Sequence, residues 1–409
     1  MINTRVHLGL LAACVTFVSG LACAGGAQNP AAVSPEIARK LNEIIAHAAL
    51  DGSRPGGMIV RVHSLKDDRV WEGAAGAFDG AKGTLIRPSD PFRVASITKS
   101  FAAGVIWRLA EDRKIGLDDL ISKYLDPSLV SRIHVLNGVS YGERITIRQL
   151  LCHCSGVYDF AEGNGAWERF VFMHPEKRWE RQEYFEYAIR DGKPYFVPGE
   201  GHHYSDTGYE LLGLVIEKVT GKPLATIYRE YIYEPLGLKE TYLEGREPAI
   251  GSPRSHNYIG FLDETNYDPT QDGPASGGQV STAKDLALYI TSVLQGRFFK
   301  APKTLAATLE VAQVPEIPSD PVKEERKSKA HFMFYSQELD GIEFIGHGGF
   351  WGSAMFYQPQ RQLIITGTSN QVERKLPLAD LAKAFDISIA ESVLQLSGAI
   401  RPPAKSRTN

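Results

Sequence analysis

The sequence predicts an α+β fold in which both ends of the chain build one antiparallel sheet with flanking helices, around an inserted, mainly helical lobe. Two observations predict this fold class. Residues 58–62 and 70–74 have the pattern of two short strands joined by a turn, and from residue 331 to 369 the period changes to two, as in strands. Between these regions, residues 117–296 show mainly the helical period with long connections. We expect a cleft between the two lobes to hold a ligand.

Length and composition indicate a globular protein. The chain has 409 residues, of which 43% are hydrophobic and 23% charged, enough for one large domain or two interlocked ones. The 45 lysines and arginines nearly balance the 48 acidic residues, and no basic stretch dominates. We therefore expect no nucleic-acid partner.

The first 24 residues have the pattern of a secretory signal peptide. Arg5 precedes an apolar run over residues 8–18, and Ala22-Cys23-Ala24 fits a cleavage site of small residues. The run is too short to predict a transmembrane span. A lipid anchor on Cys23 is the alternative, which Gly20 disfavours because leucine is preferred there. We expect a secreted or periplasmic protein after cleavage.

The predicted elements follow the chain in order. Ser34, Pro35 and Glu36 open a helix with an N-cap, a proline at the first position and an acidic first turn. A hairpin of strands follows at residues 58–62 and 70–74, and then a helix led by Ser96 with apolar residues every four positions from 97 to 109. Further helices are predicted at residues 146–152, 182–190, 209–220, 222–233 and 286–294. Strands are predicted at residues 331–336, 343–347, 353–358 and 363–369, with an amphipathic closing helix at 378–396 and no regular structure after Arg401.

These elements suggest a division of the chain. Residues 34–95 would form the first part of the α/β lobe, residues 96–300 the mainly helical lobe, residues 301–330 a linker or lid, and residues 331–400 the second part of the α/β lobe. Signal cleavage would leave two cysteines, Cys152 and Cys154. With one residue between them we expect no disulfide and no zinc site, but two small buried side chains.

Ser96 and Lys99 form the first candidate for catalysis. Residues three apart on a helix are neighbours, so the serine hydroxyl and the lysine amine can meet. The positive end of the helix favours a developing oxyanion, and a serine beside a lysine is a known form of nucleophile. The spacing alone is weak, because Ser-x-x-Lys recurs at Ser281 and Lys284, where a helix cap explains it.

Two further motifs strengthen this hypothesis: Tyr204-Ser205-Asp206, and His347-Gly348-Gly349 beside Phe350. The three motifs, in this order, resemble those of the penicillin-recognising serine hydrolases, which include class C β-lactamases, serine D-Ala-D-Ala carboxypeptidases and related esterases. Matching stretches at residues 145–156, 213–221 and 277–282 extend the resemblance over about residues 59–370. The His-x-Gly form looks closest to the carboxypeptidase branch.

The resemblance implies a role for each residue. Ser96 would attack a carbonyl carbon and become acylated, and Tyr204 would relay protons between Ser96, Lys99 and the substrate. The N–H groups of Ser96 and Phe350 would form the oxyanion hole. His347 would face the leaving-group side of the substrate, and Gly348 and Gly349 would let the substrate lie close to the strand. It implies a small-molecule or peptide substrate, peptidoglycan-derived peptides included, with no metal and no cofactor.

Two residues depart from the family pattern. Asp206 stands where asparagine is usual, and a carboxylate cannot donate a hydrogen bond to the acylamino carbonyl of a β-lactam. We expect Asp206 to pair with Lys99 and to leave Tyr204 as the main base. Gly348 replaces the usual threonine, which removes a hydroxyl that would hold a substrate carboxylate. These departures predict hydrolysis of amides or esters without a strict carboxylate requirement, and weak or absent β-lactamase activity.

Three rival interpretations remain. Residues 138–142 match the Gly-x-Ser-x-Gly elbow, but no helix immediately follows Ser140, so we interpret them as a turn. His202 and His203 are adjacent and lack a metal-site spacing, which favours loop residues over metal ligands. A protein that is acylated slowly and acts as a binder, not a hydrolase, has the same sequence features.

Overall fold

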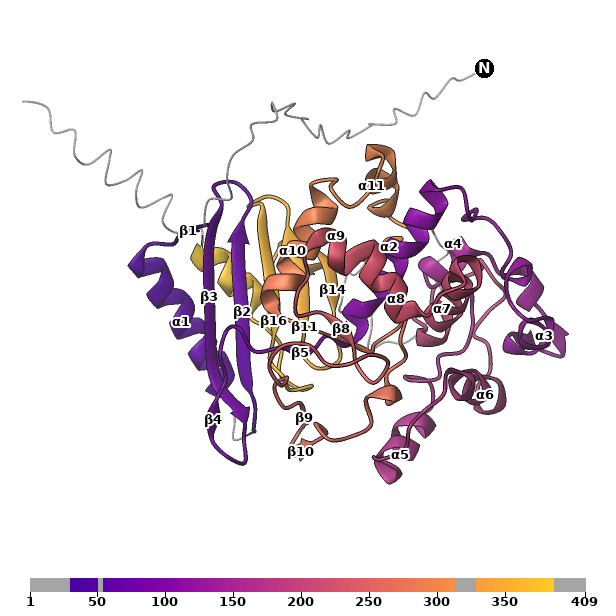
Figure 1. Cartoon of the computed structure of the whole chain (residues 1–409), viewed down its shortest axis with the longest axis horizontal. Coiled ribbons are helices and arrows are strands. Elements are labelled where there is room, and N and C mark those ends of the chain that lie inside the picture. Colours follow the sequence, from indigo (N-terminus) through magenta and orange to yellow (C-terminus); the bar gives the residue numbers. More distant parts are fainter. Residues whose placement is uncertain (1–29, 51–53, 314–328, 386–409) are drawn as a thin grey trace, which may run out of the picture. The chain divides into compact units, whose positions relative to one another are not determined.

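Strands from both ends of the chain lie side by side in one nine-stranded sheet (Figure 1). The computed structural model describes residues 30–50, 54–313 and 329–385. The strand order is β1-β3-β2-β16-β15-β14-β13-β12, with β4 paired to β3. All pairs are antiparallel except the short parallel pair of β1 and β3, so the predicted fold class is confirmed. The nine strands are β1 (Ala31–Ala32), β2 (Gly57–Ser64), β3 (Arg69–Asp79), β4 (Thr84–Leu85), β12 (Lys329–Ala330), β13 (Tyr335–Leu339), β14 (Ile342–Gly348), β15 (Ala354–Gln358) and β16 (Leu363–Thr368).

The pairing of β16 with β2 joins the two ends of the chain. Val62 lies opposite Ile365 and Val60 opposite Gly367. Gly367 has a φ of +156°, and a Cβ on it would overlap the carbonyl oxygen of Ile59. A side chain at this position would therefore push the two central strands apart.

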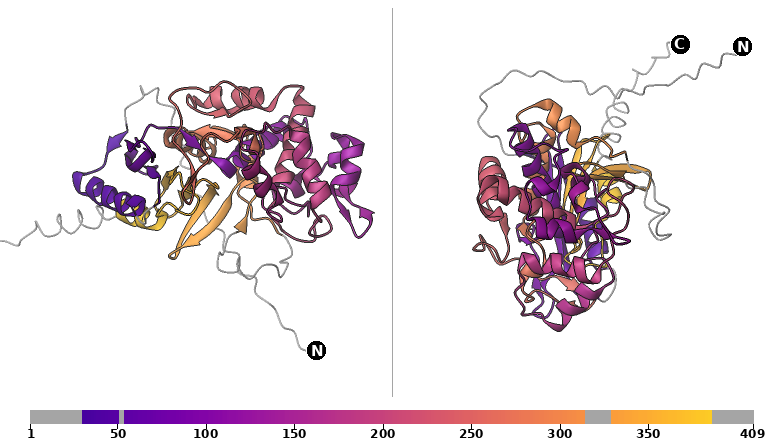
Figure 2. Two further views of the ribbon diagram at one scale, coloured as in Figure 1. Left: turned by 90° about the horizontal axis from the view of Figure 1, so that it is seen from below. Right: turned by 90° about the vertical axis from the view of Figure 1, so that its right-hand side faces the viewer.

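Helices cover both faces of the sheet. On one face, Ile37, Leu41 and Ile45 of α1 (Pro35–Leu50) pack in one core with residues of the helical segment 378–385 (Figure 2). On the other face, α10 (Ala283–Leu294) packs on β2, β15 and β16. The rest of the predicted closing helix, 386–396, and the tail lie outside the described residues.

The middle of the chain is mainly helical, as predicted. Its described helices are α2 (Thr98–Glu111), α3 (Pro127–Ile133), α4 (Ile147–Leu151), α5 (Ala166–Met173), α6 (Arg181–Asp191), α7 (Asp206–Thr220), α8 (Leu224–Tyr228), α9 (Glu234–Leu236) and α11 (Pro302–Thr308). Short strands pair within it as β5 (Phe92–Arg93), β11 (Gln279–Ser281) and β8 (Tyr242–Leu243), as β6 (Val135–Leu136) and β7 (Val139–Ser140), and as β9 (Tyr258–Ile259) and β10 (Leu262–Asp263).

Several boundaries differ from the sequence prediction. The single helix expected at 222–233 is α8, then a π-helical turn at Arg229–Tyr233, then α9, which ends at Gly237 in the left-handed conformation. Of the strand expected at 331–336, only Tyr335 and Ser336 lie in a strand, at the start of β13, and β12 ends before this range at Ala330. Helices α3, α5 and α11 were not predicted, because seven or eight residues carry little periodicity.

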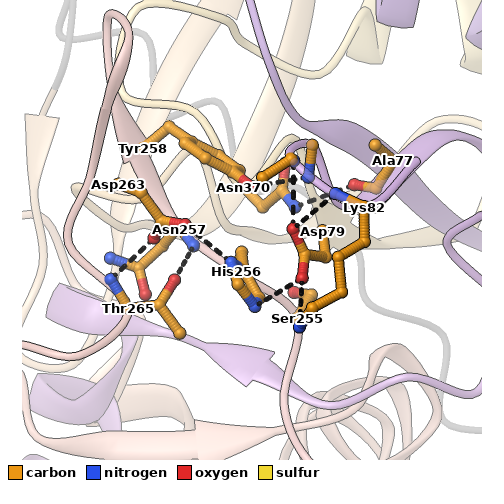
Figure 3. Close-up of polar contacts among 12 residues, drawn as sticks. Ala77, Asp79, Lys82, Ser255, His256, Asn257, Tyr258, Asp263, Thr265 and Asn370 are labelled. Carbon is orange, nitrogen blue, oxygen red and sulfur yellow. Dashed lines mark hydrogen bonds and ion pairs between the residues drawn. The ribbon is translucent and has the colours of Figure 1, made fainter. Parts of the chain in front are cut away.

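A polar network anchors the β9–β10 hairpin to the end of β3 (Figure 3). His256 lies between two carboxylates, with Nδ1 2.7 Å from Asp263 and Nε2 3.6 Å from Asp79. Asp79 also accepts from Lys82, at 3.0 Å from Nζ. Asn370 bonds Tyr258 through its backbone and Gly57 through its side chain, at 3.0 and 2.7 Å. The network therefore joins the hairpin to strands from both ends of the chain.

Both cysteines are buried as expected, but the prediction that they form no disulfide is wrong. Cys152 and Cys154 are joined in a disulfide, with their Cα atoms 5.4 Å apart. The intervening His153 has a φ of +55°, so the backbone doubles back and brings the two sulfurs together. Such a turn cannot be read from the spacing of the cysteines.

Residues 1–29 lie outside the described part of the chain, and so does the predicted signal peptide. Among the described helices, none combines the length and the apolar character that crossing a membrane requires.

The core around α2 provides a test of the packing. Phe101 is fully buried and stacks on Tyr289 of α10, with ring centroids 4.0 Å apart. We expect Phe101→Ala to destabilise the fold by about 3–5 kcal/mol, because it removes the ring and leaves a cavity. The midpoint of urea unfolding should fall accordingly. Phe261→Ala, at a residue that is 70% exposed, is the control and should leave the midpoint near wild type. Equal midpoints for the two variants would contradict the packing.

Candidate active site

The Ser96 hydroxyl lies at the start of α2, where the chain leaves β5. Ser96 sits in a 3₁₀ turn (Ala95–Ile97) that leads directly into α2 and is partly exposed, so a substrate can reach it. Ala95 before it has a φ of +46°, a conformation that non-glycine residues seldom adopt. Such strain is typical of sites whose geometry is held by the surrounding structure.

Three contacts hold this turn in place. Val94 donates its N–H to Gln279 of β11 at 3.0 Å, and its carbonyl accepts from the Ser353 hydroxyl at 2.7 Å. Gly349 packs against the same carbonyl, and a Cβ on Gly349 would overlap it. The glycine is therefore needed for the end of β14 to approach the Ser96 turn. Gly348 is not constrained in this way, because a Cβ there would meet ordinary van der Waals distances.

Lys99 is wholly buried, and its amine joins three parts of the chain. Nζ lies 3.0 Å from Ser96 Oγ, 2.5 Å from Asp206 Oδ1 and 2.9 Å from the Ser276 carbonyl oxygen. The ionised Asp206 carboxylate and the Ser276 carbonyl can only accept, so they take two N–H bonds of the amine. The third position faces Ser96, where the amine either donates a proton or offers its lone pair to receive one.

A second buried acidic residue, Glu210, orients the backbone that carries the Ser276 carbonyl. Glu210 lies one turn after Asp206 on α7, and its Oε1 accepts the N–H groups of Ala275 and Ser276, both at 2.9 Å. Burial raises the pKa of Glu210, and the nearby Arg181 opposes this rise. The sequence carried no sign of this arrangement, because the atom that contacts Lys99 belongs to the backbone.

Tyr204 precedes α7 and faces the serine. Its side chain is hydrogen-bonded to that of Ser96, and Lys99 Nζ lies 4.7 Å from the centre of its ring. Burial, and secondly the charge of Asp206, raise the pKa of Tyr204 well above its ordinary value. The phenol therefore keeps its proton at neutral pH. This direction opposes the expectation that Tyr204 is the main base and suits it to passing protons on.

Asp206 binds Lys99, as expected from the sequence. A third acidic residue, Asp159, lies near Asp206. Asp159 is fully buried, with Oδ1 accepting from the Ala161 N–H at 2.9 Å and Oδ2 without a partner among the described residues. Burial, and then the charge of Asp206, raise the pKa of Asp159 well above its usual range. Burial and Asp206 thus favour the protonated form of Asp159. No motif identified it.

His347 lies on β14 and is also buried, with 6% of the residue exposed. Its Nδ1 donates to the Gly348 carbonyl at 2.6 Å, and Nε2 has no partner among the described residues. Burial first and the charge of Lys99 second lower the pKa of His347 to about 4. The imidazole is therefore neutral at neutral pH. Phe350, at the turn after β14, is 45% exposed.

The structure also bears on the rival motifs. Ser140 lies on β7, donates its hydroxyl to the Ser131 carbonyl, and is followed by a 3₁₀ turn, not the helix that a nucleophile elbow needs. Within the described ranges, no three histidine, cysteine or acidic side chains are placed to hold a metal ion.

Comparisons with known proteins agree with this geometry. The family model described as Beta-lactamase matches residues 41–387. Penicillin-binding protein 4* of Bacillus subtilis is 30% identical over 56% of this chain and 51% of its own, and the D-alanyl-D-alanine-carboxypeptidase/endopeptidase AmpH of Escherichia coli is 28% identical over 65% and 64%. The chain thus spans about half to two thirds of the length of these curated relatives. The structure of a D-stereospecific amidohydrolase from Streptomyces is similar, with a TM-score of 0.70 and 28% identity over 86% of this chain and 99% of that one.

The buried neutral His347 makes stability depend on pH. Its pKa is about 4 in the folded state against roughly 6.5 unfolded, so between these values the unfolded chain binds more protons. This contribution to stability is therefore complete above pH 6.5 and is lost as the pH falls towards 4. We expect His347→Asn to reduce the loss of unfolding free energy between pH 7 and pH 4 by on the order of 3 kcal/mol. Urea unfolding at both pH values measures it, and identical losses in both proteins would contradict the assignment.

Proposed function

The chain belongs to the beta-lactamase family, and on that premise we propose that it is a serine hydrolase that cleaves amides or esters through an acyl-enzyme on Ser96. One observation carries the proposal. The buried Lys99 amine is held by Asp206 and the Ser276 carbonyl, and its remaining contact is with Ser96 Oγ, at 3.0 Å. This arrangement orients and activates the hydroxyl without any further cofactor.

The reaction proceeds in two steps. Ser96 Oγ attacks the substrate carbonyl carbon while its proton passes to Lys99, directly or through Tyr204, and the N–H groups of Ser96 and Phe350 stabilise the oxyanion. The amine or alcohol leaves with a proton delivered through Tyr204. Water then attacks the acyl-enzyme, which releases the acid and returns a proton to Ser96.

The site favours substrates that need no carboxylate. The family pattern places a cation or hydroxyl beside the substrate carboxylate, whereas this chain has the neutral His347 and Gly348. Asp206 already binds Lys99 and cannot donate to an acylamino carbonyl. The proposed substrates are small amides, esters or peptides, with peptidoglycan-derived peptides as one class. We also propose that the protein acts outside the cytoplasm, which the signal-like pattern of residues 1–24 supports.

Labelling with a fluorophosphonate and turnover of p-nitrophenyl esters and D-amino acid amides test the nucleophile. We expect wild type to be labelled on Ser96 and to turn over substrates of this panel, and Ser96→Ala to lose both by at least about a thousand-fold. Ser140→Ala is the matched control and should behave as wild type. Labelling without turnover would indicate a slow-acylating binder, and no labelling of Ser96 would contradict the proposal.

Asp206→Asn tests the account of β-lactam discrimination. We expect slow nitrocefin turnover by wild type, and a rise in nitrocefin kcat/KM relative to ester kcat/KM of about tenfold in Asp206→Asn, because the amide can donate one hydrogen bond to the acylamino carbonyl. Steady-state kinetics with both substrates measure this ratio. Fast nitrocefin turnover by wild type, or an unchanged ratio in the variant, would contradict the role of Asp206.

A further inference from the structure

His153 occupies a rigid turn directly after α4. It is 3% exposed and lies between the two cysteines of the disulfide. Its carbonyl accepts the N–H of His203 at 2.9 Å, and the Cys154 carbonyl accepts that of Gly199 at 2.8 Å. The turn is therefore bonded through His153 and Cys154 to the segment that leads to Tyr204.

The imidazole of His153 contacts the catalytic segment in two ways. Its ring stacks on Tyr204, with centroids 4.5 Å apart and planes 19° from parallel. Its Nδ1 accepts the N–H of Ser205 at 3.0 Å. Ser205 is the N-cap of α7, and the next residue, Asp206, binds Lys99. One side chain thus fixes the ring of Tyr204 and the backbone from which Asp206 projects.

The hydrogen bond requires a neutral imidazole. Because Nδ1 accepts, the ring proton lies on Nε2, and an imidazolium would turn a second donor towards the Ser205 N–H. Burial first, then the charges of His202 and Lys99, lower the pKa of His153 well below its ordinary value. The surroundings therefore keep the imidazole neutral, and the Ser205 N–H bond selects the tautomer that carries its proton on Nε2.

We propose that His153 is the positioning residue for Tyr204: it holds the phenol against Ser96 and Lys99 without touching the substrate. The proposal rests on the proposed function, because it takes Tyr204 as the proton relay. Displacing a relay by about 1 Å can cost about a hundred-fold in rate with little change in binding. A histidine that only fills the core would change stability, and activity would follow the folded fraction.

Three substitutions separate the two contacts. His153→Asn keeps an acceptor for the Ser205 N–H and tolerates the φ of +55°, but it loses the ring. His153→Phe keeps a ring over Tyr204 and loses the acceptor, and His153→Ala loses both. His134→Asn is the matched control, because His134 is also buried and donates one hydrogen bond, to the Phe196 carbonyl at 2.8 Å.

Kinetics give the first measurement, with a p-nitrophenyl ester as the substrate. We expect kcat to fall about a hundred-fold in His153→Ala and about tenfold in His153→Asn and His153→Phe, with KM changed by less than about threefold. The melting temperature of His153→Asn should match that of His134→Asn, whose kcat should stay at the wild-type value. Unchanged kcat in His153→Ala, or a loss in His153→Asn that His134→Asn shares, would overturn the proposal.

A second measurement is independent of activity. With 3-fluorotyrosine at position 204, the ¹⁹F resonance reports the ring stacked on it. We expect His153→Ala and His153→Asn to shift this resonance and His153→Phe to leave it closer to wild type. A resonance unmoved by His153→Ala would overturn the positioning role, whatever the activity. An inactive wild type with the expected shifts would instead contradict the proposed function and leave the contact between His153 and Tyr204 standing.

Discussion

The buried amine of Lys99 is the interaction on which the site depends. From α2, it bonds the preceding 3₁₀ turn through Ser96, the start of α7 through Asp206, and the loop before β11 through Ser276. A buried amine is costly unless its hydrogen-bonding positions are satisfied, so these three segments must meet in one geometry. The supports around it follow from this need: Glu210 aims the Ser276 carbonyl, and Ser353 and Gly349 hold the turn before Ser96.

Burial favours the uncharged form of three titratable side chains around this pair. Burial and Lys99 lower the pKa of His347, and burial, His202 and Lys99 lower that of His153. Burial and Asp206 raise the pKa of Asp159. Neither histidine therefore offers a fixed cation to a substrate carboxylate, and Lys99 already binds Asp206. The proposed preference for substrates without a required carboxylate therefore follows from desolvation as much as from the residues that depart from the family pattern.

The sequence predicted the features that have a period or a motif. Alternation located the strands that pair across the chain ends, such as β2 and β16, and three short motifs located Ser96, Tyr204 and His347. It could not predict the Ser276 contact, because any residue supplies a carbonyl. Asp159 and His153 carry no motif of their own. The disulfide depends on a left-handed turn at His153, and the raised pKa of Tyr204 depends on burial, which only the packed structure defines.

A double-mutant cycle on the Lys99–Asp206 pair tests the central claim most directly, with unfolding free energy and fluorophosphonate labelling measured for each protein. We expect Lys99→Met and Asp206→Leu each to cost about 3–5 kcal/mol, since each leaves a polar partner buried and unpaired. The double variant should recover most of this stability and still fail to be labelled on Ser96. Additive losses of stability, or labelling of the double variant at the wild-type rate, would contradict the account.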